Sequence, residues 1–252
     1  MIYFIGAGVG SVDYLLMKSV KIIRKADIIL HSLHIDKSIF ALAKKSCKVV
    51  PFSNMERMQV DLFLKVNQSK KIVYLVNGDV PFFGTLQDHI DFCENNNIPY
   101  TIVPGVSAVS AASAVIGREL VLPNISQCAI ITYLDGDGCI LDNQKIEKLA
   151  SIGATLIFYM VDSDLYRKLS ERLVKGGYSE DTPVVIVKNL LKRDESCIFT
   201  RIKNMGNISI DYWNTLILVG WVFADIKKRN EISKLPYITG FRRAEMFNLN
   251  KG

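Results

Sequence analysis

The first half of the chain alternates short apolar runs with longer stretches whose apolar side chains recur at helical spacing. The apolar runs are too short for helices and rich in β-branched residues, which is typical of buried strands. The run at 72–76 is the clearest, because it stops abruptly at Asn77-Gly78-Asp79. The expected strands are residues 3–5, 27–30, 47–51, 72–76 and 100–103. The expected helices are residues 11–25, 35–45, 57–67, 87–95 and 107–116.

The pattern restarts after residues 119–124, where Pro123 lies in a stretch without periodicity. A helix expected at 165–175 ends at Gly176-Gly177, which is typical of a glycine C-cap. We therefore predict two consecutive α/β units that face each other across a cleft. The other expected elements are strands 129–132, 155–160, 184–187 and 215–222 and helix 144–151. The predicted parts are an N-terminal α/β domain (1–118), a linker (119–124), a C-terminal α/β domain (125–226) and a polar tail (227–252).

Composition narrows the class of protein. The chain has 252 residues, of which 49% are hydrophobic and 22% charged, so it can bury a substantial core. No apolar run reaches the length of about 18 residues that a membrane span needs, and we see no signal peptide. The five cysteines form no Cys-x-x-Cys pair and only three histidines are present, so we expect no metal site and a reducing cytoplasm.

A formal net charge of +6 suits a polyanionic partner, which could be nucleic acid or a small acidic substrate. The basic residues are spread along the chain, and no basic block is interleaved with aromatic residues. We therefore interpret most lysines as solvated surface positions and do not expect nucleic acid binding.

The segment Asn77-Gly78-Asp79 has two readings. It follows a strand, and ligands of open α/β sheets bind beyond the carboxyl ends of strands. An aspartate at that position can equally cap the next helix. Taken alone, this segment leaves both readings open.

A glycine-rich turn, Gly6-Ala7-Gly8-Val9-Gly10, follows the first strand and suggests a dinucleotide site. The fingerprint requires glycine or alanine after the last glycine, and this chain has Ser11. The acid that should end the second strand is also missing, since Asp27 begins that strand. Nicotinamide binding is therefore disfavoured, and a phosphate-binding P-loop is excluded because no Gly-Lys-Ser/Thr follows.

Nucleophilic and acid–base sites find little support. No Gly-x-Ser-x-Gly elbow occurs. His31 and His34 follow the second strand, where turn histidines bonded to backbone are the favoured reading. Asp135 and Asp137 lie in a glycine-bearing loop and are interpreted as turn formers.

Several short stretches nevertheless follow one another in an order typical of a single enzyme family. The first half contributes the glycine turn at 5–10, the loop at 77–79 and Val-Pro-Gly-Val-Ser-Ala at 103–108. Each is weakly specific by itself, but their joint order resembles the tetrapyrrole (precorrin) methyltransferases over almost the whole chain. The second half adds residues 156–160, 181–185 and 218–221.

A finer likeness is to the members of this family that methylate precorrin-4, or its cobalt form, at carbon 11 on the way to cobalamin. It is carried by Gly-Tyr-Ser-Glu-Asp-Thr-Pro at 177–183, Gly220-Trp221 and Gly-Phe-Arg-Arg at 240–243.

The resemblance implies the tetrapyrrole methylase fold of the class III methyltransferases, with two α/β domains and a cofactor cleft between them. It further implies a homodimer that uses S-adenosyl-L-methionine and releases S-adenosyl-L-homocysteine. Val9 occupies the place of the proline that is usual in the glycine turn. Cofactor contacts implied by matching position are Val9, Asn77, Gly78, Asp79, Phe82, Ser107, Ala108, Met160, Leu190 and Thr215.

The implied reaction requires neither a catalytic triad nor a metal site, and the sequence indicates neither. Methyl transfer from a sulfonium releases a neutral thioether, which is a good leaving group, so catalysis can rest on positioning the two reactants, and the sequence indicates no catalytic proton acceptor. The family's substrate is a tetrapyrrole with several carboxylates, which arginine binds by charge-assisted hydrogen bonds. Arg118, Arg242 and Arg243 are the candidate substrate-binding residues, with surface roles as the alternative.

Some positions depart from the family's pattern. Val9 and Ser11 replace a proline and an aspartate, Val80 separates Gly78-Asp79 from Pro81, and the His31 segment lacks the usual tyrosine. These departures leave two alternatives open. One is a methyltransferase for another precorrin position or for uroporphyrinogen III, and the other is a catalytically impaired member that acts as a binding protein.

Overall fold

The computed structural model describes residues 1–83, 86–134 and 143–225. The chain divides into two compact units, which are described separately. Unit 1 comprises Met1–Ala111 and Leu190–Arg193, and unit 2 comprises Ala112–Asn189 and the chain from Asp194 onward. The division falls within helix α5 (Ala108–Ile116), and the linker at 119–124 stays a prediction.

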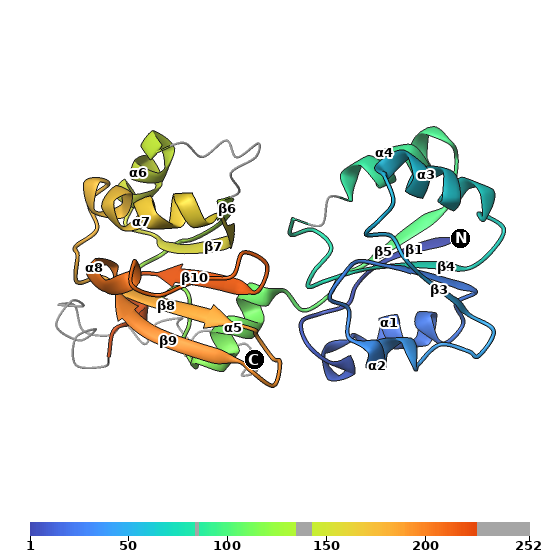
Figure 1. The fold of residues 1–252 in the computed structure, drawn as a ribbon, viewed down its shortest axis with the longest axis horizontal. Coiled ribbons are helices and arrows are strands. Elements are labelled where there is room, and N and C mark those ends of the chain that lie inside the picture. The colour runs from blue at the N-terminus through green and yellow to red at the C-terminus, as the bar shows by residue number, and fades with distance from the viewer. Residues whose placement is uncertain (84–85, 135–142, 226–252) are drawn as a thin grey trace, which may run out of the picture. The chain divides into compact units, whose positions relative to one another are not determined.

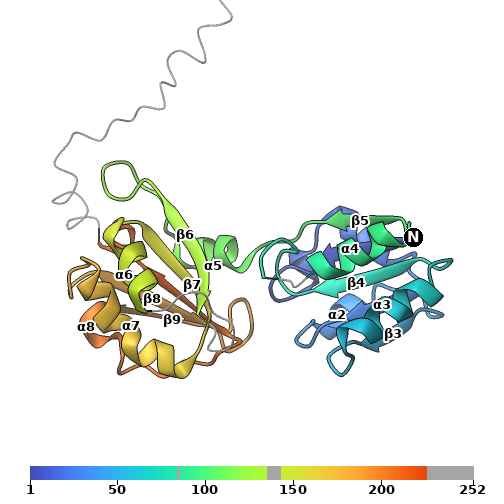
Figure 2. The same ribbon diagram turned by 90° about the horizontal axis from the view of Figure 1, so that it is seen from above.

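Unit 1 is built on a five-stranded sheet in which all strands are parallel, in the order β3-β2-β4-β1-β5. Figure 1 shows α1 and α2 on one face of this sheet and α3 and α4 on the other, and Figure 2 shows α3 and α4 lying over it. The strands are β1 (Ile2–Gly6), β2 (Ile28–His31), β3 (Lys48–Pro51), β4 (Ile72–Val76) and β5 (Tyr100–Val103). The helices are α1 (Met17–Ile23), α2 (Lys37–Phe40), α3 (Arg57–Val66) and α4 (Gln87–Asn95).

The alternation of side chains along the strands produces two cores, one on each face of the sheet. In β4, Val73 and Leu75 pack in the core beneath α1 and α2, whereas Ile72, Tyr74 and Val76 pack in the core beneath α3 and α4. All five side chains of β4 are buried, so this strand is central to unit 1.

The chain leaves β2 and β4 toward opposite faces of the sheet. The connection after β2 leads to α2, and the connection after the neighbouring β4 leads to α4 (Figure 1). Such a divergence at the carboxyl ends of adjacent strands is the place where open α/β sheets bind ligands.

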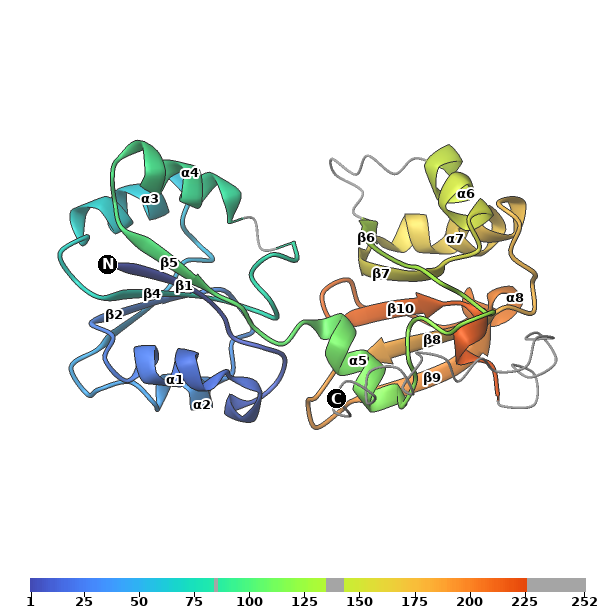
Figure 3. The same cartoon turned by 180° about the vertical axis from the view of Figure 1, so that it is seen from behind.

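Unit 2 contains a mixed sheet in the order β6-β7-β10-β8-β9, in which only β6 and β7 pair in parallel. One face is covered by α6 (Asn143–Ser151) and α7 (Ser163–Lys175), which share its main core. Figure 3 shows α5 on the other side of the sheet. The remaining elements are β6 (Ala129–Leu134), β7 (Thr155–Val161), β8 (Pro183–Lys188), β9 (Ser196–Arg201), α8 (Ile202–Met205) and β10 (Thr215–Val219).

The glycine C-cap predicted after α7 is confirmed. The Gly177 N–H bonds the Val174 carbonyl at 3.0 Å, and the Tyr178 N–H bonds the Leu173 carbonyl at 3.1 Å. This is the Schellman pattern, and it requires the left-handed backbone that Gly177 adopts with φ +111.

The helix expected at 11–25 is wrong in its first part. Ser11 caps a 3₁₀ turn at Val12–Tyr14 instead. The chain is then extended at Leu16, so α1 begins only at Met17.

Two other expected elements are too long, and two elements were missed. The helix expected at 35–45 is a single turn, because the Asp36 carboxylate caps it at Ser38 and it ends at Phe40. The strand expected at 215–222 ends at Val219, since Gly220 turns the chain into a 3₁₀ segment. The pattern gave no expectation for β9 or α8.

Among the described helices, none is long and apolar enough to cross a membrane.

Candidate functional site

Two loops of unit 1 pair with each other just beyond the carboxyl ends of β1 and β4. Gly8 and Gly78 exchange two backbone hydrogen bonds, of 3.0 Å from the Gly8 N–H and 2.8 Å from the Gly78 N–H. The Ala7 N–H also bonds the Val76 carbonyl at 2.8 Å. The glycine turn and the segment Asn77-Gly78-Asp79, which lie 70 residues apart, therefore form one backbone platform.

Glycine is required where the loop after β5 joins this platform. A Cβ on Gly105 would lie 2.2 Å from the Gly78 carbonyl oxygen, and a Cβ on Gly6 would lie 2.6 Å from the Gly105 nitrogen. No side chain fits in either place. Gly78 is different, because it has φ +67 and a Cβ added there would meet nothing within 4 Å. Its exposed backbone face is open to a ligand.

The carboxylate of Asp79 ties the loop after β4 to the loop after β5. Its Oδ1 accepts a hydrogen bond of 2.9 Å from the Gly105 N–H, and the contact is partly buried. The next residue, Val80, is 4% exposed and packs in the core beneath α3 and α4. The residue that interrupts the family pattern is thus accommodated as a core side chain.

Asn77 joins the same platform to the end of β2. Its Nδ2 donates to the Leu33 carbonyl at 3.0 Å, while the Ser32 N–H bonds the Leu75 carbonyl at 3.1 Å. His34, one of the turn histidines, has φ +67, a strained conformation for a residue with a side chain. His31 forms the backbone contact expected of a turn histidine, with its Nδ1 2.9 Å from the Ser32 carbonyl.

Ser107 and Ala108 lie at the start of α5. The Ser107 Oγ accepts a hydrogen bond of 3.3 Å from the Ser110 N–H and lies 3.0 Å from the Ser110 Oγ. Ser107 therefore caps the helix, and Ala108 is its first residue. A helix start leaves backbone N–H groups without intrahelical partners, which is the usual setting for an acceptor group of a ligand.

The turn containing Val9 meets the segment after β8. A Cβ on Gly10 would lie 2.9 Å from the Leu191 Cβ, which places Leu191, the residue after the candidate Leu190, directly against the glycine turn. Asn189 and Leu191 both have positive φ, of 50° and 59°. The backbone on either side of Leu190 is therefore in a conformation that costs free energy and that proteins often retain at functional sites.

Unit 2 supplies the last two cofactor candidates. Met160 has φ +43 and lies at a bulge, where the pairing of β6 and β7 passes from Tyr159 to Val161. Thr215 is 6% exposed and begins β10, and its Oγ1 accepts a hydrogen bond of 3.0 Å from the Asp211 N–H. Because β7 and β10 are antiparallel neighbours, the end of β7 and the start of β10 lie at the same edge of the sheet.

Phe82 is 39% exposed, and its N–H bonds the Asp79 carbonyl in a turn, so it presents apolar surface beside the platform. Arg118 donates from Nη1 to the Gly117 carbonyl at 3.1 Å, while its Nε is buried without a partner in the described part of the chain. Arg242, Arg243, Asp135 and Asp137, which the sequence analysis singled out, lie outside the described residues. Within the described ranges, no group of three or more His, Cys, Asp or Glu side chains could hold a metal ion.

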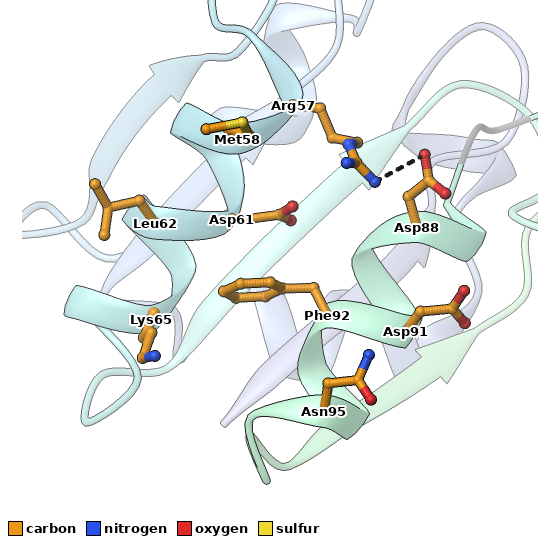
Figure 4. Close-up of a pocket in the computed structure, with 9 residues that line it drawn as sticks. All are labelled: Arg57, Met58, Asp61, Leu62, Lys65, Asp88, Asp91, Phe92 and Asn95. Atoms are coloured by element: carbon orange, nitrogen blue, oxygen red, sulfur yellow. Dashed lines mark ion pairs between the residues drawn. The ribbon is translucent and has the colours of Figure 1, made fainter.

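A surface groove lies elsewhere in unit 1, between α3 and α4 (Figure 4). Its volume is about 520 Å³, and Arg57 and Asp88 form an ion pair of 3.3 Å across its rim. Beneath it, His89 Nδ1 lies 2.5 Å from Asp61 Oδ1 in a buried contact between the helices. None of the sequence-predicted cofactor residues lines this groove, so we do not assign the cofactor to it.

Comparison with known proteins yields one family. A family model described as tetrapyrrole (corrin/porphyrin) methylases matches residues 1–206. A cobalt-precorrin-4 C(11)-methyltransferase from Methanocaldococcus jannaschii is 31% identical over 208 residues, which cover 81% of this chain and 80% of that protein. The enzyme of the same name from Priestia megaterium is 27% identical over 252 residues, covering 96% of this chain and 97% of its own.

Solved structures agree in fold. The X-ray structure of a cobalt precorrin-4 methyltransferase superposes with a TM-score of 0.82 at 27% identity, covering 89% of this chain and 96% of that chain. A uroporphyrin-III C-methyltransferase from Thermus thermophilus, solved in complex with S-adenosylhomocysteine, gives a TM-score of 0.74 at 21% identity, with 88% and 97% covered. The two-sheet architecture is therefore one that this group of structures shares.

Proposed function

The chain belongs to the tetrapyrrole (corrin/porphyrin) methylases, and we propose that it is an S-adenosylmethionine-dependent methyltransferase that methylates precorrin-4, or cobalt-precorrin-4, at carbon 11. Support comes from the two relatives of that name and from the structure of a cobalt precorrin-4 methyltransferase. One of these relatives is matched over nearly its full length, which favours an activity of the whole chain and not of a shared segment.

The observation that carries the cofactor assignment is the close approach of backbones at the platform, where Gly6, Gly8, Gly78 and Gly105 carry no side chains. S-adenosylmethionine, when bound, supplies a methyl group on a sulfonium, and the protein has to hold it without covering that group. The open face of Gly78 fits this requirement, since the cofactor can approach the backbone there without meeting a side chain. The proposed cofactor contacts are Val9, Asn77, Gly78, Asp79, Phe82, Ser107, Ala108, Leu190, Met160 and Thr215.

The chain's own contribution to catalysis is positioning. Asp79 and Asn77 fix the platform through hydrogen bonds to Gly105 and Leu33, so little reorganisation is required when the cofactor binds. Arg118, Arg242 and Arg243 are proposed to bind substrate carboxylates. The cytoplasmic location and the homodimer remain parts of this proposal, with the family as their support.

The test of the regiochemistry is incubation with precorrin-4 and methyl-labelled S-adenosylmethionine, followed by NMR of the product. Label at carbon 11 is the expected result. Label at another carbon would assign the chain to a different methylation step of the same family.

Calorimetry separates the enzyme from the impaired binding protein. We expect saturable binding of both S-adenosylmethionine and S-adenosylhomocysteine. Binding of cofactor without label transfer to any tetrapyrrole would favour the non-catalytic alternative, and absence of binding at high micromolar cofactor would exclude the enzyme.

A further inference from the structure

Ser32 is the first residue after β2, and it lies beside the site just described without belonging to the predicted set. Its backbone N–H extends the pairing with β4 by bonding the Leu75 carbonyl at 3.1 Å. The carbonyl of its neighbour Leu33 is held by Asn77. Ser32 therefore sits at the divergence of β2 and β4, where open α/β sheets bind ligands.

The hydroxyl of Ser32 lacks the partner that a buried polar group normally has. Its Oγ is buried and makes no hydrogen bond to any described residue, although the residue as a whole is partly exposed. A buried hydroxyl without a partner is destabilising, and native proteins rarely keep one unless a ligand or water completes it.

His31 fixes the backbone at this point. Because a carbonyl oxygen can only accept, the contact between His31 Nδ1 and the Ser32 carbonyl places the proton on Nδ1. The ring packs against Phe40 of α2, with centroids 4.6 Å apart. The backbone of Ser32 is thus held by the His31 side chain at its carbonyl and by β4 at its N–H, so its position is fixed without a bound ligand.

Ser19 provides a comparison within the same unit. Its Oγ also lacks a partner among the described residues, but Ser19 lies in α1 and is 0% exposed. Ser19 is enclosed in the core as a whole residue, whereas Ser32 is partly exposed. The feature particular to Ser32 is that its unpaired hydroxyl lies at the edge of the sheet where the loops converge.

We propose that the Ser32 hydroxyl donates a hydrogen bond to a carboxylate of the tetrapyrrole substrate and is a specificity-determining residue. This inference rests on the proposed function. The proposed cofactor platform involves the loops after β1, β4 and β5. Ser32 follows β2, which is the neighbour of β4 on the side away from β1 and β5. A carboxylate oxygen is the acceptor that such a substrate offers most, and a hydrogen bond to a charged group is stronger than one between neutral groups.

The experiment measures two ligands by calorimetry, S-adenosylhomocysteine and uroporphyrin III, the latter as a stable tetrapyrrole polycarboxylate. The variants are Ser32→Ala, Ser32→Thr, which keeps a hydroxyl, and Ser19→Ala as the matched control. Thermal unfolding of each free variant shows whether it is folded.

We expect Ser32→Ala to weaken uroporphyrin III binding about tenfold and to leave S-adenosylhomocysteine binding unchanged. Its midpoint of thermal unfolding should equal or exceed that of the unaltered chain, because an unpaired hydroxyl is removed. Ser32→Thr should retain most of the affinity, and Ser19→Ala should bind both ligands like the unaltered chain.

Unchanged uroporphyrin III affinity in Ser32→Ala would overturn the inference, as would an equal loss for both ligands. If the unaltered chain binds S-adenosylhomocysteine but not uroporphyrin III, the inference fails while the cofactor assignment stands. If it binds no S-adenosylhomocysteine at all, the proposed function itself fails.

Discussion

The carboxylate of Asp79 and the backbone N–H of Gly105 are joined by a hydrogen bond of 2.9 Å that links the ends of β4 and β5. The sequence left two readings for Asp79, a helix cap or a ligand contact. The bond to Gly105 is a third role, because it holds together the two loops whose backbones nearly touch at Gly78 and Gly105. If Asp79 belongs to the cofactor site as proposed, binding and stability are coupled at this residue.

Replacement of Asp79 by alanine should therefore affect both properties. We expect the free energy of unfolding to fall by about 1.5–3 kcal/mol, the range for a hydrogen bond to a charged group. Affinity for S-adenosylhomocysteine should fall as well, since the platform is no longer fixed. Urea denaturation and calorimetry measure the two effects.

Asp79→Asn is the informative control, because its amide oxygen can still accept from Gly105. It should recover most of the stability. If Asp79→Asn is as unstable as Asp79→Ala, the charge and not the hydrogen bond holds the loops.

Gly78 and Gly105 should respond differently to alanine. In Gly105→Ala the new Cβ would lie 2.2 Å from a carbonyl oxygen, so we expect a loss of about 3 kcal/mol or more, or failure to fold. In Gly78→Ala the Cβ meets open space and only the positive φ is unfavourable, at about 1–2 kcal/mol.

A folded Gly78→Ala variant tests the proposed cofactor site directly, because its methyl group would project from the open face proposed to bind the cofactor. We expect S-adenosylhomocysteine binding to be lost or strongly weakened. Unchanged affinity in this variant would remove Gly78 from the site.

Much of unit 1 could be predicted from local pattern. The bounds of α4 and β5 agree with the expected 87–95 and 100–103, because each is a short, strongly patterned segment with turn residues on both sides. The helix expected at 11–25 failed because its apolar spacing continues through residues that Ser11 caps into a 3₁₀ turn. Periodicity reports which face is apolar, but a single hydroxyl at a cap decides where the helix starts.

The relationships within the site could not be predicted, since they join residues far apart in the sequence. The Asp79–Gly105 bond spans 26 residues, and the approach of Leu191 to Gly10 brings a segment after β8 into unit 1. The resemblance supplied Met160 and Leu190 as positions only. The strained backbone at and around them became visible in three dimensions.

One edge of unit 1 carries a charge pattern that is invisible along the chain. The neighbouring strands β2, β3 and β4 are each preceded by a basic pair, and strands lie about 4.8 Å apart, so the pairs gather at one edge. Asp27 is the acid among them, bonded by Lys44 Nζ at 2.5 Å and by the Lys71 N–H at 2.8 Å. The pairs are Arg24-Lys25, Lys44-Lys45 and Lys70-Lys71.

Repulsion among these cations should make stability depend on salt. We expect the free energy of unfolding in urea to rise by about 0.5 kcal/mol between about 0.02 M and about 0.3 M NaCl, as the screening length falls from about 21 Å to about 6 Å. Lys45→Gln with Lys70→Gln should flatten this dependence. The control pair Lys148→Gln with Lys168→Gln, in unit 2, should leave the salt dependence unchanged. If both pairs of substitutions reduce the salt dependence equally, net charge alone is responsible.

Asp27 should contribute to stability only while it is ionised. The hydrogen bond from Lys44 is the main reason why the pKa of the Asp27 carboxyl lies below its ordinary value, with the Lys71 N–H as the next contribution. The contribution is therefore fully present above the unfolded pKa of about 3.9 and is lost as pH falls through the lower folded pKa. Because the carboxylate is substantially exposed, the effect is small.

The measurement is the difference in unfolding free energy between the unaltered chain and Asp27→Asn at several pH values. This difference should be constant from pH 5 to pH 7 and shrink below about pH 4. A difference that persists unchanged to about pH 2 would mean that Asp27 acts through its geometry and not through its charge.

Met160 offers a test that separates backbone strain from ligand contact. A methionine with φ +43 at a bulge costs free energy that glycine avoids, so Met160→Gly should leave the free energy of unfolding unchanged or raise it by up to about 1 kcal/mol. If the side chain contacts the cofactor as proposed, the same variant should bind S-adenosylhomocysteine more weakly.

Asn124 has φ +62 in a turn outside the proposed site, so Asn124→Gly should share the gain in stability without the loss of affinity. Equal affinities in the two variants would show that the positive φ of Met160 results from the geometry of the sheet and not from contact of its side chain with the cofactor.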